Sequence, residues 1–141
     1  MIGSIAQDLL TKVKTVTAFG TTPVRVGLAV GGKGIDPTME KVILPASWVI
    51  YTGDTNIDTS NQGECGPNIR MEFIVKILVS YGTESDLITN QFTLLENVIN
   101  AVNGKAGPVG TKKWKYEGQT IDELTDKRLV FDQRYSIITF L

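Results

Sequence analysis

The fold of this chain is decided by residues 69–81, which read Ile-Arg-Met-Glu-Phe-Ile-Val-Lys-Ile-Leu-Val-Ser-Tyr. The odd-numbered positions are all apolar, whereas the even-numbered positions include Arg70, Glu72 and Lys76. Successive side chains of a strand point to opposite faces, so this alternation predicts a strand with one apolar and one largely polar face. At roughly 3.3 Å per residue it spans roughly 40 Å, about twice the usual length. We therefore expect it to extend beyond its own domain and to take part in assembly.

Two other segments show the 3.6-residue period of amphipathic helices. The first is predicted from Ser4, as its N-cap, to about Thr17. Its apolar stripe consists of Ile2, Ile5, Leu9, Val13 and Val16, widened by Ala6 and Leu10. The second begins at Thr83, which forms a capping-box-like pair with Asp86, and it ends at residues 103–104. This second helix is expected to pack on the apolar face of the long strand.

Four more strands are predicted around these elements, at residues 23–30, 42–51, 111–118 and 128–141. Pro45 interrupts the second of them and indicates an edge or a bend there. Residues 53–68 are polar and predict a long loop, and residues 120–127 predict a polar connection. The last strand is predicted to hold the end of the chain in a sheet and to pair with the long strand.

Helices and strands are thus mixed without a repeating strand–helix–strand unit. This order indicates a single α+β domain over residues 1–141. We expect an antiparallel or mixed sheet of four to five strands, with two α-helices packed on one face.

The composition excludes several functional classes. The chain has 141 residues, a net charge of -1, no histidine and one cysteine, Cys65. Without histidine, Ser-His-Asp and Cys-His catalysis are excluded within the chain. One cysteine cannot form an intrachain disulfide or a thiolate zinc site. The net charge gives no support for nucleic-acid binding, and no apolar run is long enough to span a membrane. The first eight residues do not resemble a secretory signal, so we expect a protein made and used in the cytoplasm of its host cell.

Two ligand-binding motifs match only in part. Residues 27–33 follow the phosphate-loop pattern, but Gly34 stands where a hydroxyl should bind Mg²⁺, and no helix start follows. Residues 54–58 follow the start of a calcium loop, but Thr59 replaces the required glycine and Cys65 replaces the final glutamate. We therefore predict no metal, no cofactor and no catalytic residue, and we expect a protein that is not an enzyme.

One basic and aromatic cluster stands out near the C-terminus. On a strand, Lys113 and Lys115 share one face, whereas Lys112 joins Trp114 and Tyr116 on the other. A solvated strand face, a charged subunit interface and phosphate contact all fit this pattern.

The element order resembles that of the tail-terminator or tail-completion proteins of long-tailed bacteriophages, including the small tail proteins of Mu-like phages. The resemblance covers nearly the whole chain by order and length. It is carried by the helical segment 5–16, the strand 70–81, the capped helix 87–102 and the final Tyr135-Ser136-Ile137-Ile138-Thr139-Phe140.

The resemblance implies a homohexameric ring that caps the finished tail tube, stops its growth and offers a surface to the neck or head-completion protein. In contractile tails such a ring also meets the last sheath ring. The protein would then be part of the virion, at the head-proximal end of the tail, and be assembled in the host cytoplasm. We expect no membrane and no sequence-specific nucleic acid among its partners. The candidate residues for subunit, tube or neck contacts are Lys33, Trp48, Tyr51, Asp54, Asp58, Glu64, Arg70, Glu72, Lys113 and Lys115.

Three alternatives stay open at this point. Another head–tail joining protein or a tail tube protein would also form rings. A soluble ligand-binding module would be a monomer with one closed pocket. An enzyme that uses only carboxylates would need two acids with separated pKa values in one pocket, and no spacing in the sequence places two together.

Overall fold

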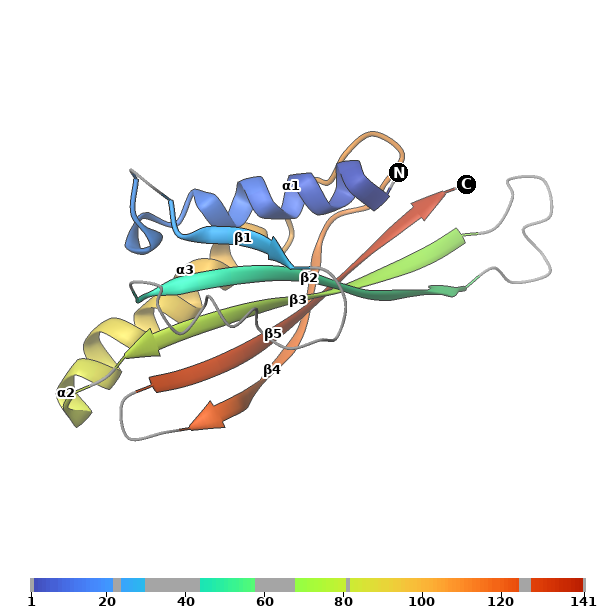
Figure 1. Ribbon diagram of the computed structural model, residues 1–141. Helices are drawn as coiled ribbons and strands as arrows, with labels where there is room; N and C mark the ends of the chain where they lie inside the picture. Colours follow the sequence, from blue (N-terminus) through green and yellow to red (C-terminus); the bar gives the residue numbers. More distant parts are fainter. Residues whose placement is uncertain are drawn as a thin grey trace.

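The computed structural model describes residues 2–21, 24–29, 44–57, 68–80, 82–124 and 128–140. It contains a five-stranded sheet and two long helical segments (Figure 1). The elements are α1 (Ile2–Lys14), β1 (Val26–Ala29), β2 (Ala46–Asn56), β3 (Asn68–Ser80), α2 (Glu84–Asp86), a π-helical turn (Leu87–Gln91), α3 (Phe92–Val102), β4 (Lys115–Leu124) and β5 (Arg128–Phe140). This order and the α+β class confirm the prediction from sequence.

Strand β3 is central in a sheet of order β1-β2-β3-β5-β4. It pairs antiparallel with β5 without a break, from Asn68 opposite Phe140 to Ser80 opposite Arg128. On its other side it pairs antiparallel with β2, and only β1 and β2 run parallel. The predicted long strand and its pairing with the C-terminal strand are confirmed. β5 has the same 13 residues and accompanies β3 along its whole length, so β3 has a paired neighbour from end to end, and its expected part in assembly stays a prediction.

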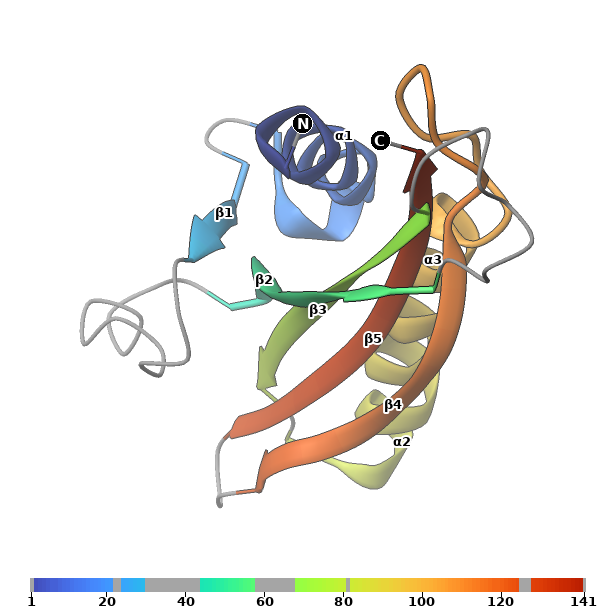
Figure 2. The same ribbon diagram turned by 90° about the vertical axis from the view of Figure 1, so that its right-hand side faces the viewer.

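The core lies between one face of this sheet and the two helices. The odd-numbered side chains of β3 from Met71 to Val79 are all buried in it. They meet the apolar stripes of α1 and α3, which lie on the same side of the sheet (Figure 2). Each fully buried Leu or Ile side chain contributes roughly 1.5–3 kcal/mol of transfer free energy, so this layer supplies the main stabilisation of the fold. We call the opposite face of the sheet the outer face.

The two helices begin and end close to the predicted residues. Thr83 caps α2 as predicted, because its Oγ1 accepts a hydrogen bond of 3.0 Å from the Asp86 amide. Helix α1 begins at Ile2 and not after Ser4, and Ile2, predicted in the apolar stripe, is 40% exposed. The helix ends at Lys14, and a 3-10 turn at Thr17–Phe19 follows it.

Three strand boundaries differ from the prediction. β1 begins at Val26, so that residues 24 and 25 lie outside it, and Leu28 is 47% exposed at this edge of the sheet. β2 begins four residues later and includes residues 53–56, which were predicted as loop. β4 includes residues 120–124, which were predicted as a polar connection. β2 pairs with β3, and β4 pairs with β5. In both cases the backbone hydrogen bonds to the partner strand outweigh the low strand propensity of residues such as Gly, Asp and Asn. The glycine-rich segment 31–37 and residues 58–67 lie outside the described residues.

Candidate functional site

The outer face of the sheet carries an open depression of about 410 Å³ lined by charged side chains. Arg70 and Glu72 reach it from β3, Glu117 from β4 and Arg134 from β5. Thr52 of β2 closes one side and donates a hydrogen bond of 3.0 Å to the Glu72 carbonyl oxygen. Two cations and two anions from three strands therefore meet in one place.

The ion pairs within this depression are loose. Arg70 Nε lies 3.8 Å from Glu72 Oε1, and Lys115 Nζ lies 3.8 Å from Glu117 Oε1. Both distances exceed the range of a hydrogen bond, and such partly exposed pairs contribute little to stability. Among the described residues, the buried Nε atom of Arg70 has no hydrogen-bond partner. The exposed side chains of Glu72 and Lys115 are therefore able to take new partners from an approaching surface, whereas Glu117 also accepts a hydrogen bond of 2.6 Å from the Ser136 hydroxyl.

Arg134 depends on the glycine beside it. Gly118 has a φ of 131°, and a Cβ atom at this position would lie 2.8 Å from Nη2 of Arg134. A side chain there would strain the backbone and displace the guanidinium. Burial raises the pKa of the neighbouring Tyr116, and the charge of Arg134 opposes this shift. The bulge at Tyr116–Gly118 thus makes room for the arginine over the strand edge.

A second charged group on the outer face is fully paired. Lys76 Nζ donates hydrogen bonds of 2.7 Å to Asp122 Oδ2 and 2.8 Å to Asp132 Oδ1. Burial alone would lower the pKa of Lys76, but the hydrogen bonds that Lys76 donates to the two carboxylates, together with their negative charges, outweigh burial and raise the pKa. The three residues join β3, β5 and β4, so we assign this group to the stability of the sheet.

Of the residues predicted from sequence, Arg70 and Glu72 come together in the depression, and Lys115 reaches its margin through Glu117. Tyr51 instead lies on the helix side, where its ring centroid is 5.3 Å from that of Phe73. The Tyr51 hydroxyl donates to Asp54 Oδ2 at 3.1 Å. Burial, and then the Asp54 carboxylate, raise the pKa of Tyr51.

The remaining predicted residues lie elsewhere. Trp48 is half-buried on the outer face, where it packs with Leu44 against Leu78 and Val130. Lys113 is exposed in the segment before β4. Lys33, Asp58 and Glu64 lie outside the described residues. The structure therefore divides the predicted set among several surfaces.

Sequence reasoning missed Arg134, Glu117 and Thr52. Arg134 stands opposite Ile74 in the ladder between β3 and β5. Its even position in the alternating C-terminal strand indicates the outer face, and the pairing register then places it beside Arg70 and Glu72. Glu117 lies in the bulge of β4, which no spacing in the sequence reveals.

The chemistry of the depression favours a protein partner. Side chains of both signs suit a surface that also carries both signs, and not a single anion or cation. Within the described ranges, no three acidic or cysteine side chains come together as a metal site. None of the described helices is long and apolar enough to cross a membrane.

Comparison with known proteins shows a likeness of fold. No protein-family model and no curated protein sequence matches the chain. Among solved structures, it is similar to a chain described as "Virion of native gene transfer agent (GTA) particle", with a TM-score of 0.64 and 11% sequence identity. The similarity covers 99% of this chain and 97% of that chain. The two chains therefore share the fold over nearly their whole lengths, although few of their residues are identical.

Proposed function

We propose that this protein is a structural component of a phage-like virion. The observation that carries the proposal is the fold shared over nearly the whole length with a chain of a gene transfer agent virion. The similarity leaves almost no part of either chain unmatched, so it is a likeness of whole subunits and not of one common motif. The outer face supports the proposal, since its loosely paired charges are suited to contact with another protein.

We further propose that the protein acts as a tail terminator, in a homohexameric ring at the head-proximal end of the tail. Such a ring would cap the tail tube, stop its growth and present a surface to the neck protein. The element order of the chain supports this role. In this proposal Arg70, Glu72, Glu117 and Arg134 contact the tube or the neck protein.

The first experiment measures the mass of the purified protein by native mass spectrometry and images it by negative-stain electron microscopy. We expect closed single rings, which bind to the ends of tail tubes made of the cognate tube protein. Long stacked tubes formed by the protein itself would favour a tube protein instead. A monomer at all concentrations that does not bind tube ends would contradict the proposed role.

A second experiment tests the depression. Arg70→Glu combined with Arg134→Glu should abolish binding to tube ends or to the neck protein while single rings still form. The matched control is Lys14→Glu, an exposed charge on α1 outside the depression. Normal binding of the double variant to both partners would remove the depression from the proposed contact.

A further inference from the structure

Two opposite ends of the molecule carry charges of opposite sign. Residues 103–116 contain four lysines and no acidic residue, whereas residues 82–102 contain three acidic residues and no lysine or arginine. The lysine-rich segment begins where α3 ends, and Glu84 lies at the other end of the 19-residue helical run 84–102, roughly 28 Å away at 1.5 Å per residue. Both views place the orange segment before β4 at one end of the molecule and α2 at the other (Figures 1 and 2).

At the first end, residues 103–114 form a segment that we call the lysine loop. Val109 at its tip is completely exposed, with a relative accessibility of 106%. Lys105, Lys112 and Lys113 are exposed around it. The chain therefore presents an apolar tip surrounded by positive charges.

Backbone hydrogen bonds hold the lysine loop in one conformation. Its base is closed between Gly104 and Trp114 at 2.8 Å, and its side is tied to β5 by the bond from the Lys112 amide to the Ile138 carbonyl oxygen, also 2.8 Å. Gly107 permits this packing, since a Cβ atom there would clash with Ile137 and Thr111. A loop ordered in advance loses little conformational entropy on binding.

At the second end, four side chains spaced four residues apart form what we call the acidic ridge. They are Glu84, Ile88, Phe92 and Glu96, which run along α2, the π-helical turn and α3. Ile88 is 56% exposed and Phe92 is 43% exposed, although both are large and apolar. The helix dipole favours Glu84 in the first turn. The exposure of the two apolar side chains has no such local explanation and fits a surface that another protein covers.

An open hollow of about 520 Å³ lies beside the acidic ridge. It is lined by Thr83, Glu84, Ser85, Ile88 and Thr89. Asp86 adds a further negative charge, and the hydrogen bond from Asn90 holds the pKa of its carboxyl below the usual value.

We infer that the lysine loop of one copy docks on the acidic ridge of the next copy, with Val109 in the hollow beside Ile88. The two surfaces complement each other in charge, and each carries exposed apolar side chains beside its charges. Because they are different surfaces at opposite ends, the contact is head-to-tail and produces a closed ring when the rotation between copies closes. This inference rests on the proposed function, because the contact is assigned to the ring proposed above.

The test uses two charge-reversal variants of the full chain. The loop variant carries Lys112→Glu and Lys113→Glu, and the ridge variant carries Glu84→Lys and Glu96→Lys. In each variant alone, loop and ridge have the same sign, so the concentration for half-assembly should rise about tenfold or more. When the two are mixed, every contact again joins opposite signs, and rings with an even number of subunits should form. Lys14→Glu is the control that should assemble normally.

Val109→Asp provides a second measurement that does not depend on the charge-reversal variants remaining folded. Val109 is completely exposed in its own chain, so circular dichroism and the Tm should be unchanged while assembly weakens. Normal assembly of all three variants would overturn the inference and leave a ring-forming function intact. Failure of the mixture to assemble, with both partners folded, would also overturn it. Wild-type filaments that the same variants abolish would support the contact but contradict the terminator function.

Discussion

Lys76 on β3 and Asp132 on β5 stand directly opposite each other in the ladder, and their Nζ and Oδ1 atoms are 2.8 Å apart. The Lys76 side chain is 10% exposed and that of Asp132 17%, whereas that of Asp122, the second partner, is 45% exposed. Two carboxylates with different burial thus share one cation. The more buried contact is expected to contribute more, because solvent screens it less.

This difference can be measured with two single variants. Asp132→Asn should lower the free energy of unfolding by about 1–3 kcal/mol, because a largely buried ammonium loses a charged partner. Asp122→Asn should lower it by less than about 1 kcal/mol. Urea denaturation at pH 7 gives both values. Equal losses in the two variants would contradict the assignment of Asp132 as the main partner.

The stability should decrease at alkaline pH. The pKa of Lys76 is raised in the folded state, so its contribution is complete below the unfolded value of about 10.4 and is lost as the pH rises through the folded value. Burial, with a smaller effect of Tyr116, raises the pKa of Tyr135. The folded state therefore keeps the phenolic proton above about pH 10, where the unfolded chain releases it. Urea unfolding at about pH 9 and 11 should show the loss, and Tyr135→Phe should reduce it.

Gln133 is a buried hydrogen-bonding centre between the sheet and α3. Its Nε2 donates to the Leu95 carbonyl oxygen at 3.0 Å, and its Oε1 accepts from the Tyr135 hydroxyl at 2.7 Å. Gln133→Leu should cost about 1–3 kcal/mol, because a buried hydroxyl loses its acceptor. Gln119→Leu removes only one bond of 3.2 Å from an exposed residue and serves as the control. Similar Tm values for both variants would show that the centre has little effect on stability.

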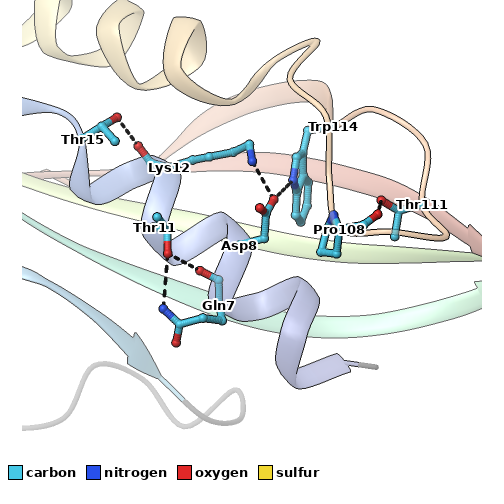
Figure 3. Close-up of polar contacts among 8 residues, drawn as sticks. All are labelled: Gln7, Asp8, Thr11, Lys12, Thr15, Pro108, Thr111 and Trp114. Atoms are coloured by element: carbon cyan, nitrogen blue, oxygen red, sulfur yellow. Dashed lines mark hydrogen bonds and ion pairs between the residues drawn. The ribbon is translucent and has the colours of Figure 1, made fainter.

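Asp8 connects α1 with the base of the lysine loop (Figure 3). Its Oδ2 accepts hydrogen bonds of 2.8 Å from both the Trp114 indole and Lys12 Nζ. Asp8→Ala should cost about 1–3 kcal/mol, because the buried indole N–H loses its acceptor. Asp8→Asn retains an acceptor oxygen and should cost less. Thermal unfolding followed by tryptophan fluorescence measures both, with Gln7→Ala as a surface control.

Thr83 should contribute to stability through its cap. Thr83→Ala removes the acceptor of the Asp86 amide and should cost about 1 kcal/mol. Thr83→Ser keeps the hydroxyl and should be close to the wild type. Amide hydrogen exchange at Asp86 should accelerate in the alanine variant alone, and unchanged exchange would indicate that the cap is not formed in solution.

The sequence predicts best where apolar residues alternate over a long stretch. β3 lies within one residue of its predicted position, and β5 begins at the predicted Arg128. Prediction fails where polar residues form strands only because a partner pairs with them. Gly53 and Asp54 belong to β2 because they lie opposite Glu72 and Met71, a tertiary constraint that overrides local propensity.

The candidate site was predictable only in part for a related reason. Arg70 and Glu72 follow from the alternation of β3, whereas Arg134 and Glu117 join them through the register of β5 and the bulge of β4. Trp114 was predicted on a strand face with lysine, yet it is buried in the core. The partner that holds its indole, Asp8, is 106 residues away in the sequence, beyond the reach of any local pattern.

The equal lengths of β3 and β5 have a mechanical consequence. Ladder hydrogen bonds in an antiparallel pair run perpendicular to the strands, so a pull along one strand loads them in shear, all together and not one after another. β3 is held in this way on both sides, by β5 along all 13 of its residues and by β2 along most of them. A force applied along β3 is therefore shared by all of these hydrogen bonds, and we expect the sheet to resist extension in this direction.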